Sequence, residues 1–291
     1  MRHKTVLITG GNAGIGYETA KELLRRGARV IIACRNINKG LQSLTKLHLE
    51  TKCKQDSIRL MECDLSSFES VRKFAKLYNA KEDRLDVLIC NTGLIYSPNI
   101  YTKDGLNSIM QTNYLGHFLL TNLLLDKLKQ CRSSRIINVS SSAHKYPPTN
   151  KGITALVNFK SDAIWGSYGP SKACQILSSY KLKQDLLDHG VDVFTLNPGW
   201  IWTSFRDSLH SALGTWLFVI VYPLLIIAKF IFGKTPLTGA RTTVYCAVEP
   251  SLKDSYVLYF ENCAPAKPSS LCTNSESAEY LWKLSCEAVG L

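Results

Sequence analysis

The 291-residue sequence predicts one α/β domain built on a doubly wound parallel sheet of about seven strands. Two observations carry this prediction. Short apolar runs of strand length alternate with longer helical segments along the chain. The polar motifs follow directly on the apolar runs, and open α/β sheets bind ligands at the carboxyl ends of their strands. No repeat, low-complexity tract or linker interrupts the chain, so we expect residues 1–291 to form a single domain.

The first apolar run, residues 5–9, predicts a buried parallel strand. A glycine-rich turn follows it, and a helical segment then continues to Gly27. A strand, a glycine-rich turn and a helix N-terminus together bind a pyrophosphate, because backbone N–H groups and the helix dipole point at the anion. An ordinary turn is the alternative. The turn supplies the first candidate cofactor-binding residues: Gly10, Asn12, Gly14, Ile15 and Gly16.

The second predicted strand, residues 29–33, ends in Cys34, Arg35 and Asn36. Dinucleotide folds that bind NAD carry an acidic residue near this position for the ribose 2′-hydroxyl. Here no acid is present, and a guanidinium such as that of Arg35 suits the 2′-phosphate of NADP. The sequence therefore favours NADP(H) over NAD(H). The alternative is a solvated arginine at the end of a strand.

The later elements repeat the alternation of strand and helix. Further strands are predicted at residues 58–63, 85–90, 135–139, 191–196 and 257–260. Helices are predicted at residues 41–50, 66–78 with Ser66 as N-cap, 112–128, and from Tyr168 onward. The polar residues after these strands are Asp64 and Leu65, Asn91 to Gly93, Ser140 to Ser142, and Asn197 to Gly199.

Tyr168 and Lys172 lie four residues apart and can share one face of a helix. A lysine ammonium near a phenol favours the phenolate, which makes tyrosine usable as a general acid or base near neutral pH. By itself the pattern is weak, since a half-buried tyrosine beside a solvated lysine gives the same spacing. The other motifs decide between the two readings.

Taken together, the motifs resemble the short-chain dehydrogenase/reductase family over residues 4 to about 260. The matching residues occur in the family's order and spacing: Gly10, Gly14, Gly16, Asp64, Leu65, Asn91, Gly93, Asn113, Ser141, Tyr168, Lys172, Pro198, Gly199 and Thr203. One departure is Cys90-Asn91-Thr92-Gly93, where the family usually has Asn-Asn-Ala-Gly. Arg35, residues 113–118, residues 139–144 and residues 281–286 look like the retinol-dehydrogenase-like branch.

This resemblance implies a Rossmann fold and a set of catalytic roles. Tyr168 would be the acid/base, and Lys172 would lower its pKa and bind the nicotinamide ribose. Ser141 would donate a hydrogen bond to the substrate oxygen, with its neighbours as alternatives. Asn113 would hold a backbone group or water that relays protons to Lys172. The cofactor would contact Asp64, Leu65, Asn91, Gly93, Tyr168, Lys172, Pro198, Gly199 and Thr203 as well as the glycine-rich turn.

Two stretches outside these motifs bear on access to the site. Residues 142–167 are too many for a tight connection, and we expect either a lid or a surface excursion. His144, within this stretch, is expected to be a structural or surface histidine rather than a catalytic one. Residues 211–228 carry no charged side chain, and apart from Lys229 the apolar run continues to residue 232.

The length of the apolar run would allow a membrane span, but it lies inside the domain and Pro223 interrupts it. We expect residues about 205–235 to form an apolar cap that covers the substrate site and dips into one leaflet. Arg206, Lys229, Lys234 and Arg241 would meet anionic headgroups. A buried helix pair or a homodimer contact is the alternative.

Composition narrows the setting of the protein. The net charge of +12 is not concentrated in basic runs, so an anionic cofactor or membrane surface fits better than nucleic acid. The ten cysteines form no Cys-x-x-Cys pair and read as buried residues in a reducing compartment, without a metal site. Residues 1–4 lead straight into the first strand, which argues against secretion. We expect an intracellular protein on the cytosolic face of the endoplasmic reticulum or a lipid droplet.

The sequence thus predicts an NADP(H)-dependent oxidoreductase that interconverts a lipophilic alcohol and its aldehyde or ketone. Retinoids, steroids, polyprenoids and fatty aldehydes all suit an apolar cap. A non-catalytic, cofactor-binding scaffold protein at a membrane is the alternative, and the intact Ser141, Tyr168 and Lys172 speak against it. A nucleotide-sugar epimerase or dehydratase is disfavoured by the glycine spacing.

Overall fold

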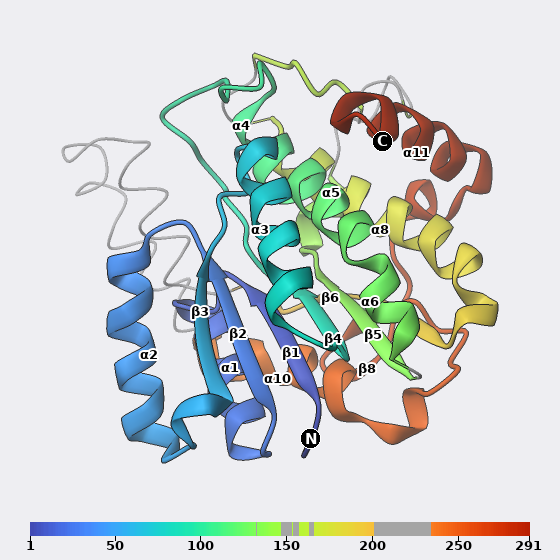
Figure 1. Cartoon of the computed structure of the whole chain (residues 1–291). Helices are drawn as coiled ribbons and strands as arrows, with labels where there is room; N and C mark the ends of the chain where they lie inside the picture. The colour runs from blue at the N-terminus through green and yellow to red at the C-terminus, as the bar shows by residue number, and fades with distance from the viewer. Residues whose placement is uncertain (132, 147–152, 154–156, 163–165, 201–233) are drawn as a thin grey trace, which may run out of the picture.

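The computed structural model describes residues 1–131, 133–146, 153, 157–162, 166–200 and 234–291. Its centre is one sheet, so the predicted single α/β domain is confirmed (Figure 1). The strands are β1 Thr5–Thr9, β2 Arg29–Cys34, β3 Ile58–Glu62, β4 Val87–Cys90, β5 Ser134–Val139, β6 Val191–Asn197, β7 Tyr259–Glu261 and β8 Ala264–Pro265. Strands β1 to β7 pair in parallel, and β8, which the sequence did not predict, pairs antiparallel with β7.

The strand order β3-β2-β1-β4-β5-β6-β7-β8 explains where the site lies. From β1 the chain moves outward through β2 and β3, and it then returns to β4 on the other side of β1. This reversal leaves a crevice between the loops that follow β1 and β4, the place where doubly wound sheets bind their ligands.

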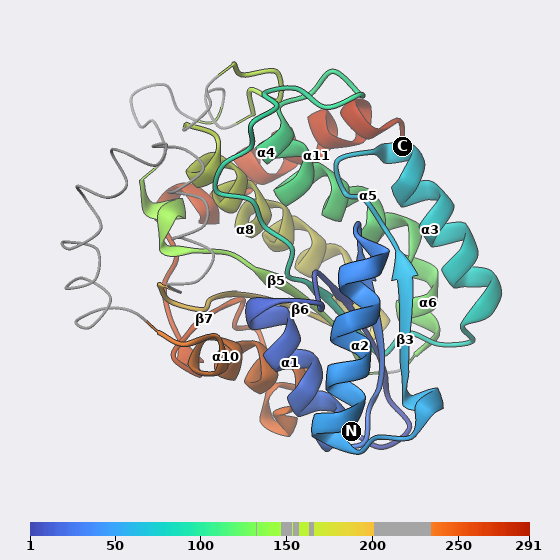
Figure 2. The ribbon, with the colours of Figure 1, turned by 90° about the vertical axis from the view of Figure 1, so that its left-hand side faces the viewer.

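Helices cover both faces of the sheet (Figures 1 and 2). Helices α1 Gly14–Arg25, α2 Ile37–Thr51 and α10 Pro236–Val248 cover one face. Helices α3 Phe68–Lys81, α5 Gly116–Leu123 and α8 Tyr168–Asp185 cover the other, and α11 Ser275–Val289 packs on α8. The sheet separates two apolar clusters, one beneath each helical layer, which hold the strands rigid beneath the site.

Several predicted boundaries were wrong for local reasons. Ser67, not Ser66, caps α3 by accepting a hydrogen bond from the Ser70 N–H, while the Ser66 hydroxyl donates to Asp64. The predicted single helix at residues 112–128 is instead α4 Ser108–Met110, a π-helical turn Gln111–Leu115, α5, and α6 Leu125–Gln130. Helices α10 and α11 were not predicted from the sequence.

The long stretch before Tyr168 is described only in part. Pro147, Pro148 and Trp165 lie outside the described residues. Phe159 is buried in the core beside Tyr114, with ring centres 6.2 Å apart, and its carbonyl accepts a hydrogen bond from the Asn107 N–H. This part of the stretch is therefore anchored to the domain rather than lying free on the surface.

The cysteines are all free thiols, and seven of the ten are buried. In the part of the chain that the structure describes, no helix is both long and apolar enough to cross a membrane. The predicted apolar cap at residues 205–235 falls almost wholly outside the described residues.

Candidate active site

The glycine-rich turn joins β1 to α1 and shows why glycine is needed there. Gly10 and Gly14 have φ angles of +66° and +55°, which favour glycine. A Cβ on Gly16 would lie 2.4 Å from the Gly10 carbonyl oxygen, so the helix can approach the turn only without a side chain. Ala13 at the N-cap offers no side-chain cap, which leaves the first N–H groups of α1 available to an anion.

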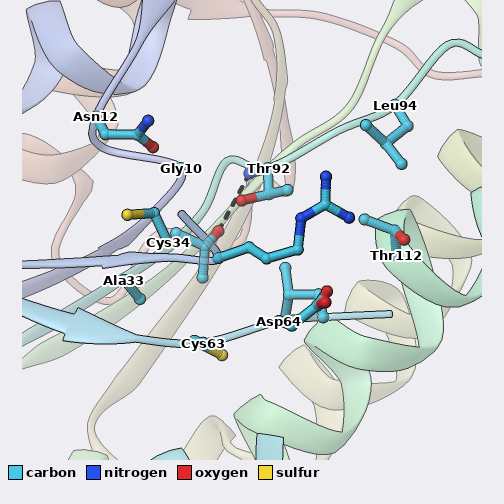
Figure 3. Close-up of a pocket in the computed structure, with 12 residues that line it drawn as sticks. Gly10, Asn12, Ala33, Cys34, Cys63, Asp64, Thr92, Leu94 and Thr112 are labelled. Atoms are coloured by element: carbon cyan, nitrogen blue, oxygen red, sulfur yellow. Dashed lines mark hydrogen bonds between the residues drawn. The ribbon is translucent and has the colours of Figure 1, made fainter. Parts of the chain in front are cut away.

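A pocket of about 130 Å³ opens beside this turn (Figure 3). Its walls come from the ends of β1, β2 and β3 and from the segment after β4. Of the predicted cofactor residues, five line it: Gly10, Asn12, Arg35, Asp64 and Leu65. The buried hydroxyl of Thr112 has no hydrogen-bond partner among the described residues, and it too lines this pocket. A bound ligand can satisfy such a group. The turn, the free helix N–H groups and the orphan hydroxyl fit a dinucleotide.

The loop after β4 is tied to β1 by Thr9. The Thr9 hydroxyl accepts hydrogen bonds from the N–H groups of Asn91 and Thr92, at 2.9 and 3.1 Å. The Asn91 side chain donates to the Thr9 carbonyl at 2.9 Å. The family departure at Cys90 and Thr92 therefore leaves the loop firmly placed, and Leu94, three residues after Asn91, lines both this pocket and the next.

A larger cavity of about 660 Å³ lies on the other side of Leu94. It brings together most of the remaining predicted site residues: Ile15, Asn91, Gly93, Ser141, Tyr168, Lys172, Pro198 and Gly199. Apolar side chains, among them Ile95, Val139 and Trp200, make up much of the rest of its wall. Thr203 lies outside the described residues.

Tyr168 and Lys172 occupy the first two turns of α8, as the spacing predicts. The Lys172 Nζ lies 5.9 Å from the centre of the Tyr168 ring and donates a 2.8 Å hydrogen bond to the Val139 carbonyl at the end of β5. Lys172 is only 3% exposed. The hydrogen bond to the end of β5 thus holds the Lys172 ammonium in the lining of the larger cavity.

The sequence predicts that Lys172 lowers the pKa of Tyr168, but in the structure a different group has this effect. Burial raises the pKa of Tyr168, and the group that lowers this pKa is the Ser141 hydroxyl, through a hydrogen bond. Burial also lowers the pKa of Lys172 to about 7. The lysine is therefore itself a group that titrates near neutral pH.

The three consecutive serines after β5 have different surroundings. Ser140 is buried, and its hydroxyl donates to the Lys172 carbonyl at 3.0 Å. Ser142 is exposed, whereas Ser141 is hydrogen-bonded to Tyr168. Ser141 is therefore the serine that adjoins Tyr168 in the lining of the larger cavity.

Asn113 lies in the π-helical turn and is fully buried. Its side chain accepts a hydrogen bond from the Leu94 N–H at 2.7 Å and donates to the Leu94 carbonyl at 2.9 Å and to Ser171 at 3.0 Å. Asn113 does not line either cavity. It holds the loop after β4 against α8.

The backbone carbonyl of Asn113 contacts two side chains that sequence reasoning missed. His117 Nδ1 lies 2.9 Å from it, and Gln175 Nε2 donates to it at 2.9 Å. Because a carbonyl only accepts, the neutral imidazole carries its proton on Nδ1, and Nε2 accepts from the Thr9 hydroxyl at 2.8 Å. Burial lowers the pKa of His117 to about 4, so the ring is neutral at pH 7.

His144 is a structural residue, in agreement with the sequence-based reading. It is fully buried, its Nδ1 lies 2.6 Å from the Ser141 carbonyl, and its Nε2 accepts from the Ser269 N–H at 3.1 Å. The ring therefore braces the backbone of Ser141 against the segment that precedes α11.

Comparison with known proteins places this arrangement in a family. A sequence model described as "short chain dehydrogenase" matches residues 4–214. Human retinol dehydrogenase 11 is 37% identical over 292 residues, which cover 99% of this chain and 86% of that protein. Human WW domain-containing oxidoreductase is 38% identical and covers 97% of this chain and 67% of that protein.

A solved structure supports the same assignment. An uncharacterized protein from Mycobacterium paratuberculosis superposes with a TM-score of 0.74 at 30% identity, covering 99% of this chain and 94% of that chain. The cofactor of this family is a nicotinamide dinucleotide, which the glycine-rich turn and its pocket fit. The chain is thus an oxidoreductase of the short-chain dehydrogenase/reductase family, similar to the retinol dehydrogenases.

Proposed function

We propose that the protein is an NADP(H)-dependent oxidoreductase that interconverts a lipophilic alcohol and its aldehyde or ketone. The observation that carries the proposal is the convergence of Ser141, Tyr168 and Lys172 on one wall of the larger cavity. The apolar remainder of that wall suits a lipophilic substrate. The 37% sequence identity to retinol dehydrogenase 11 also supports a substrate of this class. Retinoid, steroid, polyprenoid and fatty carbonyl compounds are the candidate substrates.

In the reductive direction, the Tyr168 hydroxyl donates its proton to the carbonyl oxygen as that oxygen gains charge. Ser141 donates a second hydrogen bond to the same oxygen. Lys172, held by the Val139 carbonyl, supports the phenolate that remains. The nicotinamide, when bound, supplies or accepts the hydride. The oxidative direction uses the same groups, with Tyr168 taking the proton from the alcohol.

For the cofactor, we propose NADP(H) over NAD(H). Arg35 follows the last residue of β2 and lines the smaller pocket, where Asp64 supplies the one carboxylate among the described lining residues. A guanidinium at that place favours a phosphate on the ribose, and no carboxylate follows β2 to bind a free 2′-hydroxyl.

We further propose that residues 211–232 attach the protein to an intracellular membrane, at the endoplasmic reticulum or a lipid droplet and facing the cytosol. The run of uncharged residues and the basic residues beside it support this proposal.

The catalytic proposal predicts that Tyr168→Phe strongly lowers turnover but leaves cofactor binding intact. NADPH oxidation should be measured against a panel of retinal, a steroid ketone, a polyprenal and a long-chain aldehyde. Loss of the proton donor should lower kcat by at least about 10²-fold. NADPH affinity, followed by fluorescence, should change little.

Tyr180→Phe, the same change on a half-buried tyrosine further along α8, is the matched control and should keep full activity. Full turnover by Tyr168→Phe would contradict the acid/base assignment. Binding of NADPH by the wild type without turnover of any carbonyl in the panel would favour the scaffold alternative.

A further inference from the structure

One buried side chain links the catalytic lysine to Asn113. Gln175 lies on α8, three residues after Lys172, and is 2% exposed. Its Oε1 accepts a 3.0 Å hydrogen bond from Lys172 Nζ, and its Nε2 donates a 2.9 Å hydrogen bond to the Asn113 carbonyl. The side-chain amide therefore spans the distance between two groups that the family resemblance connects by a proton relay.

The orientation of this amide is dictated by its partners. The ammonium of Lys172 can only donate, so the amide oxygen must face it. The Asn113 carbonyl can only accept, so the amide nitrogen must face it. His117 Nδ1 donates to the same carbonyl oxygen, at 2.9 Å. Both ends of Gln175 are thus satisfied, and the bridge has one possible direction.

Lys172 has few other groups to support its charge. In the described part of the chain, the titratable groups that face it are Tyr168 on its own helix, Cys90 from β4 and neutral His117 from α5. Among the described residues, no carboxylate lies within ion-pairing distance of its Nζ. Burial lowers the pKa of Lys172 to about 7. The carbonyl dipoles of Val139 and Gln175 are therefore its hydrogen-bonded acceptors.

We propose that Gln175 is a positioning residue of the active site, which holds the Lys172 ammonium beside Tyr168 and keeps it charged. This inference rests on the acid/base role proposed for the Tyr168–Lys172 pair. A primary amide accepts and donates hydrogen bonds but does not pass a proton on as water does. The hydrogen bond to the Asn113 carbonyl therefore orients the Gln175 side chain toward Lys172.

The proposal has a defined sign in a pH profile. The ammonium form of Lys172 exists below its pKa and is lost as pH rises through it. Gln175→Met keeps the length of the side chain but removes the accepting oxygen, so the pKa of Lys172 falls and the upper limit of activity moves to lower pH. Gln175→Glu places a carboxylate there, so that limit moves to higher pH. We expect shifts of about one pH unit or more in opposite directions.

The matched control is Gln111→Met. Gln111 is also a fully buried glutamine with both ends bonded, but its partners are Thr102 and Asp104. Loss of a buried amide should lower the stability of both methionine variants. Only the Gln175 change should move the pH profile, which separates positioning of Lys172 from a structural role.

The second readout needs no substrate and no turnover. The Lys172 side chain should be titrated by NMR of protein labelled with ¹³C at lysine Cε, its signal identified by its loss in Lys172→Met. We expect the Lys172 midpoint to fall in Gln175→Met and to rise in Gln175→Glu. Equal midpoints in the wild type and both variants would overturn the proposal, even if the enzyme is fully active.

The same titration separates this proposal from the proposed function. If the wild type turns over no carbonyl compound but the midpoints move as expected, the catalytic role fails and the Gln175 assignment stands. If Gln175→Met does not fold, the shift in Gln175→Glu alone decides, since a carboxylate at that distance must raise the pKa if it faces the ammonium.

Discussion

We expect Arg35, a single residue at the end of β2, to determine the preference between NADP(H) and NAD(H). It is exposed, its neighbours on β2 are buried, and it lines the pocket beside the glycine-rich turn. Arg35→Glu should lower NADPH affinity by about 10- to 100-fold, because a charge-assisted hydrogen bond to phosphate is lost and a repulsion is added. NADH affinity should stay the same or rise, since a carboxylate can accept from the ribose hydroxyl.

Fluorescence titration with both cofactors measures this change. Lys39→Glu is the control, because Lys39 is an exposed cation near the start of α2 that does not line the pocket. An unchanged ratio of NADPH to NADH affinity in Arg35→Glu would show that Arg35 does not determine the preference for NADP(H).

At this scale the sequence located residues that line the larger cavity more readily than the residues that hold them in place. Tyr168 and Lys172 could be found because their spacing has a chemical meaning. The choice of Ser141 over its neighbours rested on resemblance, and the structure gives it a physical reason in the Ser140 hydrogen bond to the Lys172 carbonyl. Gln175 stayed hidden because a glutamine on a helix carries no chemical signal until its two partners are known.

At the scale of elements, Gly116 sets how closely α5 approaches the end of β3. A Cβ on Gly116 would lie 2.4 Å from the carbonyl oxygen of Leu65, a backbone atom that cannot rotate away. Gly116→Ala should therefore push α5 and the Leu65 loop apart, at a cost of about 1–3 kcal/mol in the free energy of unfolding. Because Leu65 lines the smaller pocket, dinucleotide affinity should fall as well.

Urea unfolding and cofactor titration test both effects. Gly40→Ala is the comparison, since a Cβ there would meet the side chain of Leu60 at 2.7 Å and that of Cys34 at 2.9 Å, which are free to move. It should cost less stability than Gly116→Ala. A Gly116→Ala protein with wild-type stability and affinity would show that the contact is easily relaxed.

The elements themselves were predictable to different degrees. The parallel strands follow from apolar runs, since both faces of the sheet are buried. The break within residues 112–128 was not predictable, because a π-helical turn and a bend at Leu124 leave no mark in an apolar segment. Helix α10 follows an undescribed stretch and starts with Thr235 as N-cap before Pro236, a signal that could have located it.

At the scale of the whole molecule, net charge and the uncharged run at residues 211–228 bear on membrane attachment. We predict that the full chain floats with vesicles containing about 30% anionic phospholipid, and that high salt weakens but does not abolish the association. Leu217→Asp combined with Leu225→Asp should abolish it, because charge in the run opposes insertion.

Leu49→Asp is the control, since Leu49 is a 72% exposed leucine on α2, outside that run. Complete release of the wild type by high salt, or flotation that survives the double substitution, would contradict attachment through this run.

The overall architecture was predictable from the sequence in part. Alternation of strands and helices fixes the doubly wound class, whereas the pairing of β1 with β4 comes from the chain reversal that only three-dimensional packing reveals.

The burial of Lys172 has a chemical consequence beyond proton transfer. Burial lowers the pKa of Lys172 to about 7 and so favours the uncharged amine. An uncharged amine is a nucleophile, and it condenses with an aldehyde to form an imine as water leaves. An aldehyde that waits beside Tyr168 without being reduced would therefore become bonded to the enzyme. By accepting the hydrogens of Nζ, the Val139 and Gln175 oxygens favour the charged ammonium, whose nitrogen has no lone pair with which to attack a carbonyl carbon.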